Sequence, residues 1–235
     1  MKLITFSLWG NDTKYCIGAV KNATLVNDIY PGWDSRFYVG KSTDRQYVRQ
    51  LQNLGAQVIE MQEEGDWTGM FWRFYAACEP EVEVMISRDT DSRLNLREKA
   101  AVDEWLNSDK GFHIMRDHPW HRTEILGGMW GIKKGVIPNL KKLLDERSKG
   151  DWYDTDQAFL REEVYPLITN NSMVHDEFFE KKPFPTPRHK LEFVGQVFDY
   201  KENTVEEHTE ALHKAQSILD GVIKYKGNQQ IKGIS

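Results

Sequence analysis

The chain has 235 residues, 40% of them hydrophobic, which is enough to bury the core of one sizeable domain and argues against a small scaffold held by disulfides. Lys and Arg number 31 against 36 Asp and Glu, and the formal net charge of −5 argues against a surface that binds nucleic acid through its phosphates. The two cysteines, Cys16 and Cys78, are too few for a disulfide framework and indicate a reducing compartment.

The N-terminal segment is apolar but short. Leu3–Trp9 is too short for a signal-peptide core or a membrane-spanning helix, so we expect a cytoplasmic protein with no transmembrane segment and no nucleic-acid partner. Helical patterns separate it from three further apolar runs, and the four strand candidates are Leu3–Trp9, Phe37–Val39, Val58–Met61 and Val82–Ile86. This alternation predicts an α/β domain with a mostly parallel central sheet flanked by helices.

Three helices are predicted in this first half of the chain. Apolar residues recur at helical spacing over 47–54 and stop at Gly55, which suits a C-cap. A second helix covers Thr68–Cys78. A third begins at Asn95, because an Asn with Glu98 three residues later resembles a capping box.

The pattern is less regular after residue 110, but five further elements are predicted. They are strands at His113–Arg116 and Gly128–Ile132, a helix from Ile137 to about Gly150, a helix over Asp156–Val164 that Pro166 ends, and a last helix over Val205–Tyr225. No repeat or long linker interrupts them. We therefore expect a single domain over residues 1–225 and a flexible tail at 226–235.

Two carboxylates, Asp89 and Asp91, stand two residues apart just after the fourth predicted strand. Ligands of open α/β sheets bind at the carboxyl ends of the strands, and a carboxylate pair there can hold a hard divalent cation beside diphosphate oxygens. Such a cation would neutralise charge on a departing nucleotide diphosphate. A solvated turn is the alternative, because chance gives about one Asp-x-Asp pair in this composition and Asp154-x-Asp156 is a second.

The surrounding segments resemble the nucleotide-sugar half of GT-A fold (Rossmann-like) glycosyltransferases. A helix carrying Arg73 precedes the Asp-x-Asp strand, and in that superfamily an Arg at this place commonly faces the donor. Leu126–Ile132 is similar to the family's small-residue strand beside the donor sugar, and Asp156-Gln157 resembles its Asp-Gln motif at a helix start. His175 falls where several metal-dependent members supply a third ligand. The order of these motifs, more than any one of them, carries the resemblance.

The resemblance implies a metal-dependent glycosyltransferase, hexosyl or related, that moves a sugar from a nucleotide diphosphate donor, UDP-linked, to a hydroxyl of a saccharide or glycoconjugate. Asp91 and Asp156 would be catalytic, the first through Mn²⁺ or Mg²⁺ and the second on a sugar hydroxyl. The implied metal ligands are Asp89, Asp91 and His175. The implied donor-binding residues are Ser7, Leu8, Trp9, Tyr15, Arg73, Asp89, Gly127 and Gly128, and the implied acceptor-binding residues are Trp130, Asp154 and Gln157.

The resemblance also implies a nucleotide-sugar half at about 1–110 and an acceptor half at about 111–225. The loop after the first strand would hold the nucleotide, with Tyr15 placed to stack on the base if that segment is a loop. Each assignment has a structural alternative: Arg73 and Trp130 can be packing residues, Asp156 a helix cap and His175 an ordinary histidine.

Other interpretations stay open. His113, His118 and His121 can be a zinc site, although they lack the His-Glu-x-x-His spacing. Alternatively, these three histidines line a polar loop near the cleft, together with Arg116, Asp117 and Trp120. Arg88 and Arg93 flank the carboxylate pair and can balance its charge. A nucleotidyltransferase would use the same pair but needs a glycine-rich, basic loop after the first strand, and a non-catalytic carbohydrate-binding module would use only the aromatic residues.

Overall fold

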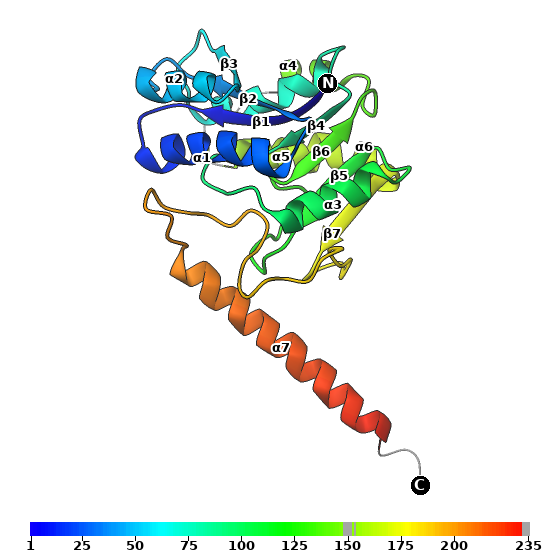
Figure 1. The fold of residues 1–235 in the computed structure, drawn as a ribbon. Helices are drawn as coiled ribbons and strands as arrows, with labels where there is room; N and C mark the ends of the chain where they lie inside the picture. The colour runs from blue at the N-terminus through cyan, green and yellow to red at the C-terminus, as the bar shows by residue number, and fades with distance from the viewer. Residues whose placement is uncertain (148–151, 153, 232–235) are drawn as a thin grey trace.

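The fold is built on one seven-stranded sheet (Figure 1). The computed structural model describes the backbone of residues 1–147, 152 and 154–231, and the side chains of these residues up to 221. The strand order is β3-β2-β1-β4-β6-β5-β7. The strands are β1 (Lys2–Leu8), β2 (Asp34–Val39), β3 (Gln57–Glu60), β4 (Val84–Ser87), β5 (Phe112–Arg116), β6 (Trp130–Lys133) and β7 (Ser172–Asp176). Within this sheet β6 alone is antiparallel to its neighbours, so the predicted mostly parallel sheet is confirmed.

Helices flank both faces of this sheet, as predicted. The α-helices are α1 (Thr13–Ile29), α2 (Arg45–Asn53), α3 (Leu96–Leu106), α4 (Leu140–Glu146), α5 (Thr155–Phe159), α6 (Tyr165–Ile168) and α7 (Glu206–Ile231). The tighter 3₁₀ segments are η1 (Trp67–Cys78) and η3 (Thr169–Asn171), and the wider π segment is η2 (Leu160–Val164).

Two hydrophobic clusters fill the two faces of the sheet. Successive side chains of a strand point to opposite sides, and Leu3 and Ile4 of β1 accordingly belong to different clusters. The cluster around Leu3 contains Phe71 and Phe74 of η1 together with residues of α4 and α5. The cluster around Ile4 contains residues of α1, α2 and α3, including Trp105. Much of the aromatic content of the chain therefore lies in the core.

The helix α1 has no counterpart in the sequence-based prediction. Its buried positions are mostly small or polar and include Cys16, Ala19, Asn22, Ala23 and Val26, which recur every three or four residues. A scan for large hydrophobic residues does not detect such a stripe, although its spacing is helical. As a result the expected loop after the first strand is shorter than predicted.

The helix α1 packs closely on the Asp-x-Asp loop. The side-chain amide of Asn22 donates to the Ser92 carbonyl at 2.8 Å. A Cβ atom added at Gly18 would overlap the carbonyl oxygen of Thr90. The loop that carries the two carboxylates is therefore held from behind by α1.

Replacing Gly18 is expected to destabilise the protein. In Gly18→Ala the new methyl forces α1 away from the Thr90 carbonyl, and such overpacking lowers the free energy of unfolding by about 1–3 kcal/mol. Urea denaturation measures this change. Gly221→Ala on α7 is the control, because a methyl there meets no atom within 4 Å, and it should leave stability unchanged or raised. Equal stability of Gly18→Ala and the native chain would contradict the packing argument.

The helical region near Pro166 is longer than predicted. Asp156–Val164 was expected to end at this proline, but the helical backbone continues from η2 through α6 to Ile168. Pro166 occupies the first turn of α6, where a missing N–H costs little. The helix predicted from Ile137 begins instead at Leu140, and its predicted end at Gly150 lies outside the described residues.

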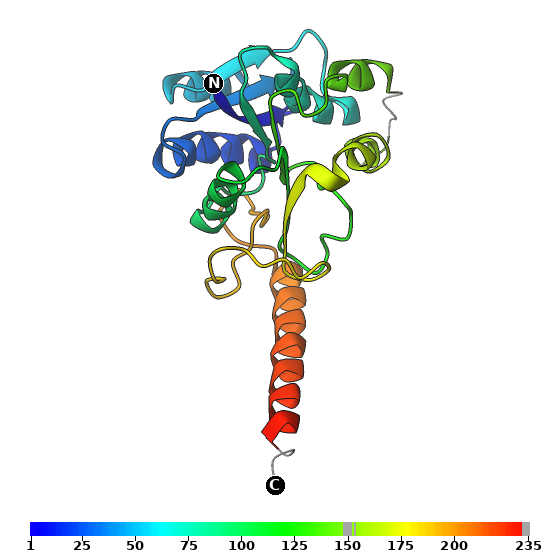
Figure 2. The same ribbon diagram turned by 90° about the vertical axis from the view of Figure 1, so that its right-hand side faces the viewer.

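The last helix, α7, projects away from the sheet (Figure 2). It covers Glu206–Ile231 and so extends beyond the predicted end at Tyr225. Residues 232–235 of the predicted tail lie outside the described part of the chain. Within the part that is described, no helix combines the length and the apolarity that a membrane crossing requires.

Candidate active site

A cavity of about 660 Å³ opens at the carboxyl ends of β1 and β4. Because these two strands are parallel, the segments that follow them meet at one edge of the sheet. The antiparallel strand β6 brings its own start to the same edge. The cavity is lined by Ser7–Asp12 after β1, by Asp89–Asp91 after β4, by residues before β6 and by the start of α5.

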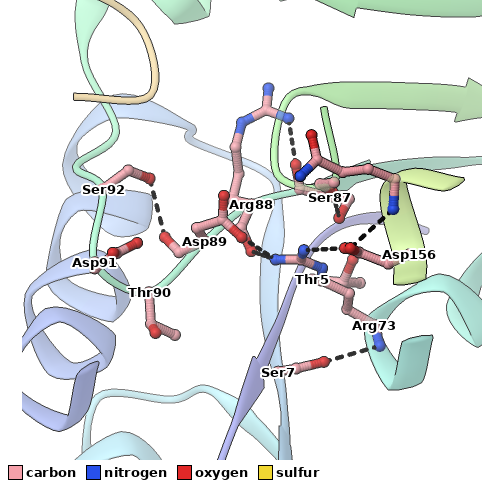
Figure 3. Close-up of polar contacts among 12 residues, drawn as sticks. Thr5, Ser7, Arg73, Ser87, Arg88, Asp89, Thr90, Asp91, Ser92 and Asp156 are labelled. Carbon is pink, nitrogen blue, oxygen red and sulfur yellow. Dashed lines mark hydrogen bonds and ion pairs between the residues drawn. The ribbon is translucent and has the colours of Figure 1, made fainter. Parts of the chain in front are cut away.

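Arg73 is the buried cation of this cavity, and only 4% of it is exposed. Its Nη1 donates to the Arg88 carbonyl at 2.8 Å and to a carboxylate oxygen of Asp89. Its Nη2 donates to Oδ2 of Asp156 at 3.2 Å, so one guanidinium joins both acidic motifs (Figure 3). Its Nε is buried and has no hydrogen-bond partner in the described part of the chain.

The local structure of η1 aims Arg73 at the cavity. Asp66 caps the segment by accepting from the Thr68 N–H at 2.7 Å, and Phe71 and Phe74 anchor it in the core. The Arg73 N–H itself donates to Oγ of Ser7 at 3.2 Å (Figure 3). Arg73 is therefore held at its backbone by Ser7 and at its guanidinium by Asp89 and Asp156.

Asp91 lies beside Asp89 and pairs with a lysine that the sequence reasoning missed. Lys14 of α1 reaches Oδ2 of Asp91 at 2.7 Å. Burial raises the pKa of Asp91, and the charge of Asp89 raises it further, whereas Lys14 opposes the shift. The two carboxylates thus repel each other, and a positive charge placed between them would relieve that repulsion.

Asp156 opens α5, as predicted, and its side chain is buried. Oδ1 accepts from the Gln157 N–H at 2.9 Å. Burial raises the pKa of Asp156, and the nearby Arg73 guanidinium counteracts this. Asp154 also lines the cavity, and its Oδ1 accepts from the side-chain amide of Gln157 at 2.9 Å.

Gly127 and Gly128 make room for the carboxylates. A Cβ atom at Gly127 would overlap Oδ2 of Asp156, and one at Gly128 would overlap Oδ2 of Asp89. Gly127 lines the cavity. Gly128 does not, so its predicted contact with the donor is replaced by a contact with Asp89.

Aromatic rings and imidazoles form another part of the cavity lining. His118, Trp120 and His121 follow β5, and Phe193 packs on His118 with ring centroids 4.5 Å apart. We call these four residues the histidine wall. His208, from the start of α7, meets Trp120 edge-on at 5.2 Å. The predicted position of the first three residues near the cleft is confirmed, whereas Phe193 and His208 were missed because they lie about 75 or more residues further along the chain.

Acid is expected to destabilise the protein through His121. Burial lowers the pKa of His121 to about 3 from an ordinary value of 6.5. Below the ordinary value the unfolded chain binds a proton that the folded chain does not, so this stabilisation is complete above that pH and declines as the pH falls towards the folded pKa. From about pH 7.5 to about pH 4.5 the loss should be roughly 3 kcal/mol, because each pKa unit corresponds to about 1.4 kcal/mol.

Urea denaturation at the two pH values measures this loss, and His121→Phe is the comparison. The variant should lose less stability on acidification. It should still lose some, because burial also lowers the pKa of His113. The same loss in both proteins would contradict the assignment to His121.

No protein-family model and no curated protein matches the sequence. Among solved structures, TarS from S. aureus (residues 1–349) matches with a TM-score of 0.53, 15% identity and 75% of this chain covered. Glucosyl-3-phosphoglycerate synthase from M. tuberculosis matches with a TM-score of 0.50, 12% identity and 80% of this chain covered. The chain has the GT-A fold.

This chain is shorter than the GT-A structures that it matches. It spans 58% of the TarS structure, 65% of a mycobacterial protein that matches with a TM-score of 0.50 and 12% identity, and 73% of the synthase. At these identities the likeness establishes the fold alone, and the chemistry has to be argued from the residues of this chain.

His175 does not reach the GT-A cavity, which corrects the predicted third metal ligand. It lies on β7, at the far edge of the sheet from β3. Its Nδ1 shares a hydrogen bond with Nε2 of His113 at 2.8 Å, and its Nε2 meets Oε2 of Glu104 at 3.2 Å. Both ring nitrogens are thus engaged by other side chains, and β6 and β5 stand between β7 and the Asp-x-Asp strand.

Trp130 is a core residue, which corrects its predicted acceptor contact. It is 1% exposed and does not line the cavity. Its ring stacks on Phe112 at 5.2 Å and meets Phe74 edge-on at 5.1 Å. Alternation along β6 points this side chain into the core, so the structural alternative holds.

The zinc hypothesis is also wrong for His113. This residue stacks on Trp105 inside the core, with ring centroids 5.2 Å apart, whereas His118 and His121 lie in the histidine wall. Over the described side chains, no group of three His, Cys, Asp or Glu residues can hold a metal ion.

Arg88 and Arg93 do not balance the charge of the carboxylate pair. Nε of Arg88 pairs with Glu98 at 2.7 Å, and both side chains are 2% exposed. Nη2 of Arg93 pairs with Glu202 at 2.9 Å. Among the described residues, the cations that contact the pair are Arg73 and Lys14.

The residues predicted to hold the nucleotide all line the cavity, but one of them lies on a helix and not in the expected loop. Ser7, Leu8 and Trp9 line it, and Trp9 packs edge-on against Trp72 at 5.9 Å. Tyr15 also lines it but lies on α1 and not in a loop, with 39% of the residue exposed. The ring that was predicted to stack on a base therefore lies on a helix.

Proposed function

We propose that this chain is a metal-dependent glycosyltransferase that moves a sugar from a UDP-linked donor to an acceptor hydroxyl. The observation that carries the proposal is the position of Arg73, whose buried guanidinium joins Asp89 to Asp156 at the base of the GT-A cavity. This arrangement gathers one cation and two acidic motifs where a diphosphate and its sugar meet. The shared fold supports the proposal but does not by itself identify the reaction.

The diphosphate end of the donor is assigned to the surroundings of Arg73. Its Nε is a buried donor with no partner in the described residues, and a phosphate oxygen in the cavity would satisfy it. Guanidinium groups suit phosphate because their donors form a planar fork. The nucleoside would then lie towards Ser7–Trp9 and Tyr15, where an exposed ring is available for stacking.

The cation is assigned to Asp89 and Asp91. Mg²⁺ and similar ions are commonly held by one or two carboxylates together with substrate phosphates and water, so two carboxylates at a cavity mouth are a sufficient protein contribution. The mutual repulsion of this pair fits the binding of a positive ion. When bound, Mn²⁺ or Mg²⁺ supplies charge neutralisation for the departing diphosphate.

His208 replaces His175 in this proposal as the nearby imidazole. His208 lines the same cavity as the carboxylate pair, and burial lowers its pKa, which favours the neutral ring. A neutral imidazole can bind Mn²⁺, although among the described side chains Asp89, Asp91 and His208 do not form a ready-made three-residue site. The start of α7 thus contributes to the same end of the cavity as the Asp-x-Asp loop.

Asp156 is assigned to the sugar. Its carboxylate fills the space that a side chain at Gly127 would need, and so faces the cavity beside Arg73. Asp154 and Gln157 add two further polar groups at the cavity surface. The raised pKa of Asp156 also suits a group that removes a proton from an acceptor hydroxyl.

Binding of UDP to the purified chain tests the proposal. Calorimetry should show UDP binding with Mn²⁺ or Mg²⁺ and much weaker binding after chelation, because the cation joins the diphosphate to Asp89 and Asp91. A panel of nucleotide sugars, screened for slow hydrolysis, then identifies the sugar. Cation-independent binding, or no binding, would overturn the proposal and favour a carbohydrate-binding module.

A further inference from the structure

The histidine wall (His118, Trp120, His121 and Phe193) has no role in the donor assignments. Trp120 is 51% exposed, although it lies at the cavity. His208 connects the wall to the diphosphate end, because its ring meets Trp120 edge-on at 5.2 Å and lines the same cavity as Asp91. The wall therefore adjoins the place where the bond to the donor sugar would break.

We propose that the histidine wall is the acceptor subsite and that it accepts an uncharged sugar ring. The inference rests on the proposed glycosyl transfer and adds the chemical class of the acceptor. Three observations support it: the fixed hydrogen-bond donor of the wall, its rigid support and the charge of the cavity.

His121 presents an uncharged N–H donor. The Asp117 backbone N–H donates to Nδ1 of His121 at 3.0 Å, which leaves Nε2 to carry the ring proton. His118 is fixed in the same tautomer, because its Nδ1 accepts from the Trp120 N–H at 3.1 Å and its Nε2 donates to the His208 carbonyl at 2.9 Å. An N–H of this kind suits a sugar hydroxyl oxygen and adds no charge to attract an anion.

A buried carboxylate holds the wall rigid. Asp117 is fully buried and accepts from Nη2 of Arg188 at 2.6 Å and from Nε of Arg97 at 2.9 Å. It also accepts from the Val194 N–H at 2.9 Å, and so ties the segment around Phe193 to the loop that follows β5. A preformed surface of this kind binds a rigid ring with little loss of conformational entropy.

The cavity is acidic and therefore disfavours an anionic acceptor. Among the described residues that line it, Arg73 is the one permanent cation, and five carboxylates accompany it: Asp12, Asp89, Asp91, Asp154 and Asp156. The proposed donor occupies that cation with its diphosphate, whose charge the divalent cation offsets, and Lys14 pairs with Asp91 alone, so net negative charge remains. A phosphorylated or carboxylated acceptor would meet uncompensated negative charge, whereas a neutral ring can stack on Trp120 and hydrogen-bond to His121.

Saturation-transfer NMR on the purified chain tests the inference without any nucleotide. The probes are an equimolar set of the methyl glycosides of glucose, galactose and mannose, and a matched set of the corresponding 6-phosphates. We expect saturation of at least one neutral glycoside and of none of the phosphates. Trp120→Ala should lower the saturation-transfer signal of the neutral glycosides roughly five- to tenfold, since an aromatic stacking partner is lost.

Two variants make the result specific. His121→Phe keeps a ring but removes the N–H donor, so it should also lower the neutral signal. Trp152→Ala removes a tryptophan of similar exposure, 49%, that does not line this cavity, and it should leave the signal unchanged. Three outcomes would each overturn the inference: a saturation-transfer signal from the sugar phosphates, no signal from any neutral glycoside, or a loss of the neutral-glycoside signal in Trp152→Ala equal to that in Trp120→Ala. Because no nucleotide is present, failure of UDP binding with an intact sugar signal would overturn the donor proposal alone.

Discussion

Asp91→Ala is expected to lower cation-stimulated hydrolysis of the nucleotide sugar by roughly 10²- to 10³-fold, the effect of removing one group that stabilises developing negative charge. The fold should remain intact. The Asp91 side chain is partly accessible and its one ion-pair partner, Lys14, is itself 31% exposed. The backbone carbonyl of Asp91 still accepts from the Phe198 N–H at 2.9 Å. Initial rates with and without Mn²⁺ measure the effect.

A second lysine-paired carboxylate provides the control for this variant. Asp103 pairs with Lys99 on α3 and does not line the cavity, so Asp103→Ala should leave hydrolysis unchanged. Circular dichroism and thermal unfolding check that both variants fold. If Asp91→Ala kept its cation-stimulated rate, the assignment of the metal to this carboxylate would be wrong.

Arg73→Met is expected to lower the free energy of unfolding by about 3–5 kcal/mol, the usual cost of breaking a buried ion pair and leaving its partner charged. Asp156, 3% exposed, would lose the guanidinium that opposes the effect of burial on its pKa. That pKa would then rise further above the unfolded value. The variant should therefore regain stability as the pH falls through the folded pKa towards the unfolded value, because in that range the folded state binds a proton that the unfolded state does not.

A double variant separates charge burial from lost packing. Asp156→Asn in the Arg73→Met background removes the unpaired charge and should recover part of the lost stability, as measured by urea denaturation. Arg45→Met is the matched control, since Arg45 forms an exposed ion pair with Glu60 and its loss should not be measurable. A double variant no more stable than Arg73→Met would show that the guanidinium acts through packing and not through charge.

The carboxyl edge of the sheet was the most predictable part of this protein. Alternating apolar residues located β1 and β4, and the rule that ligands bind beyond the carboxyl ends of parallel strands placed Asp89 and Asp91 at the cavity. Arg73 and Asp156 were found through the resemblance to GT-A enzymes, which rests on short motifs in a fixed order along the chain. The carboxylate pair, Arg73 and Asp156 each belong to a short motif, so they can be recognised without knowing how distant segments pack.

The mistakes have a common origin in contacts between distant segments. Lys14 was missed because α1 buries small residues, and a search for large hydrophobic side chains does not detect that helix. His175 was chosen for its order in the chain, but β7 lies at the edge of the sheet and its histidine bonds to His113. His208 was missed because nothing near it in sequence shows that the start of α7 returns to the cavity.

The sequence by itself determined the fold class and the strand after which the carboxylate pair lies, and the family resemblance pointed to Arg73 as a cation that faces the donor. The tertiary structure decided which side chains face the cavity, because that depends on strand register and on which distant segments pack together. Trp130 points into the core from β6 and Trp120 lines the cavity from the loop after β5, although the sequence placed both near the cleft. A side chain alternates with each residue of a strand, so its final direction is fixed only when the sheet is assembled.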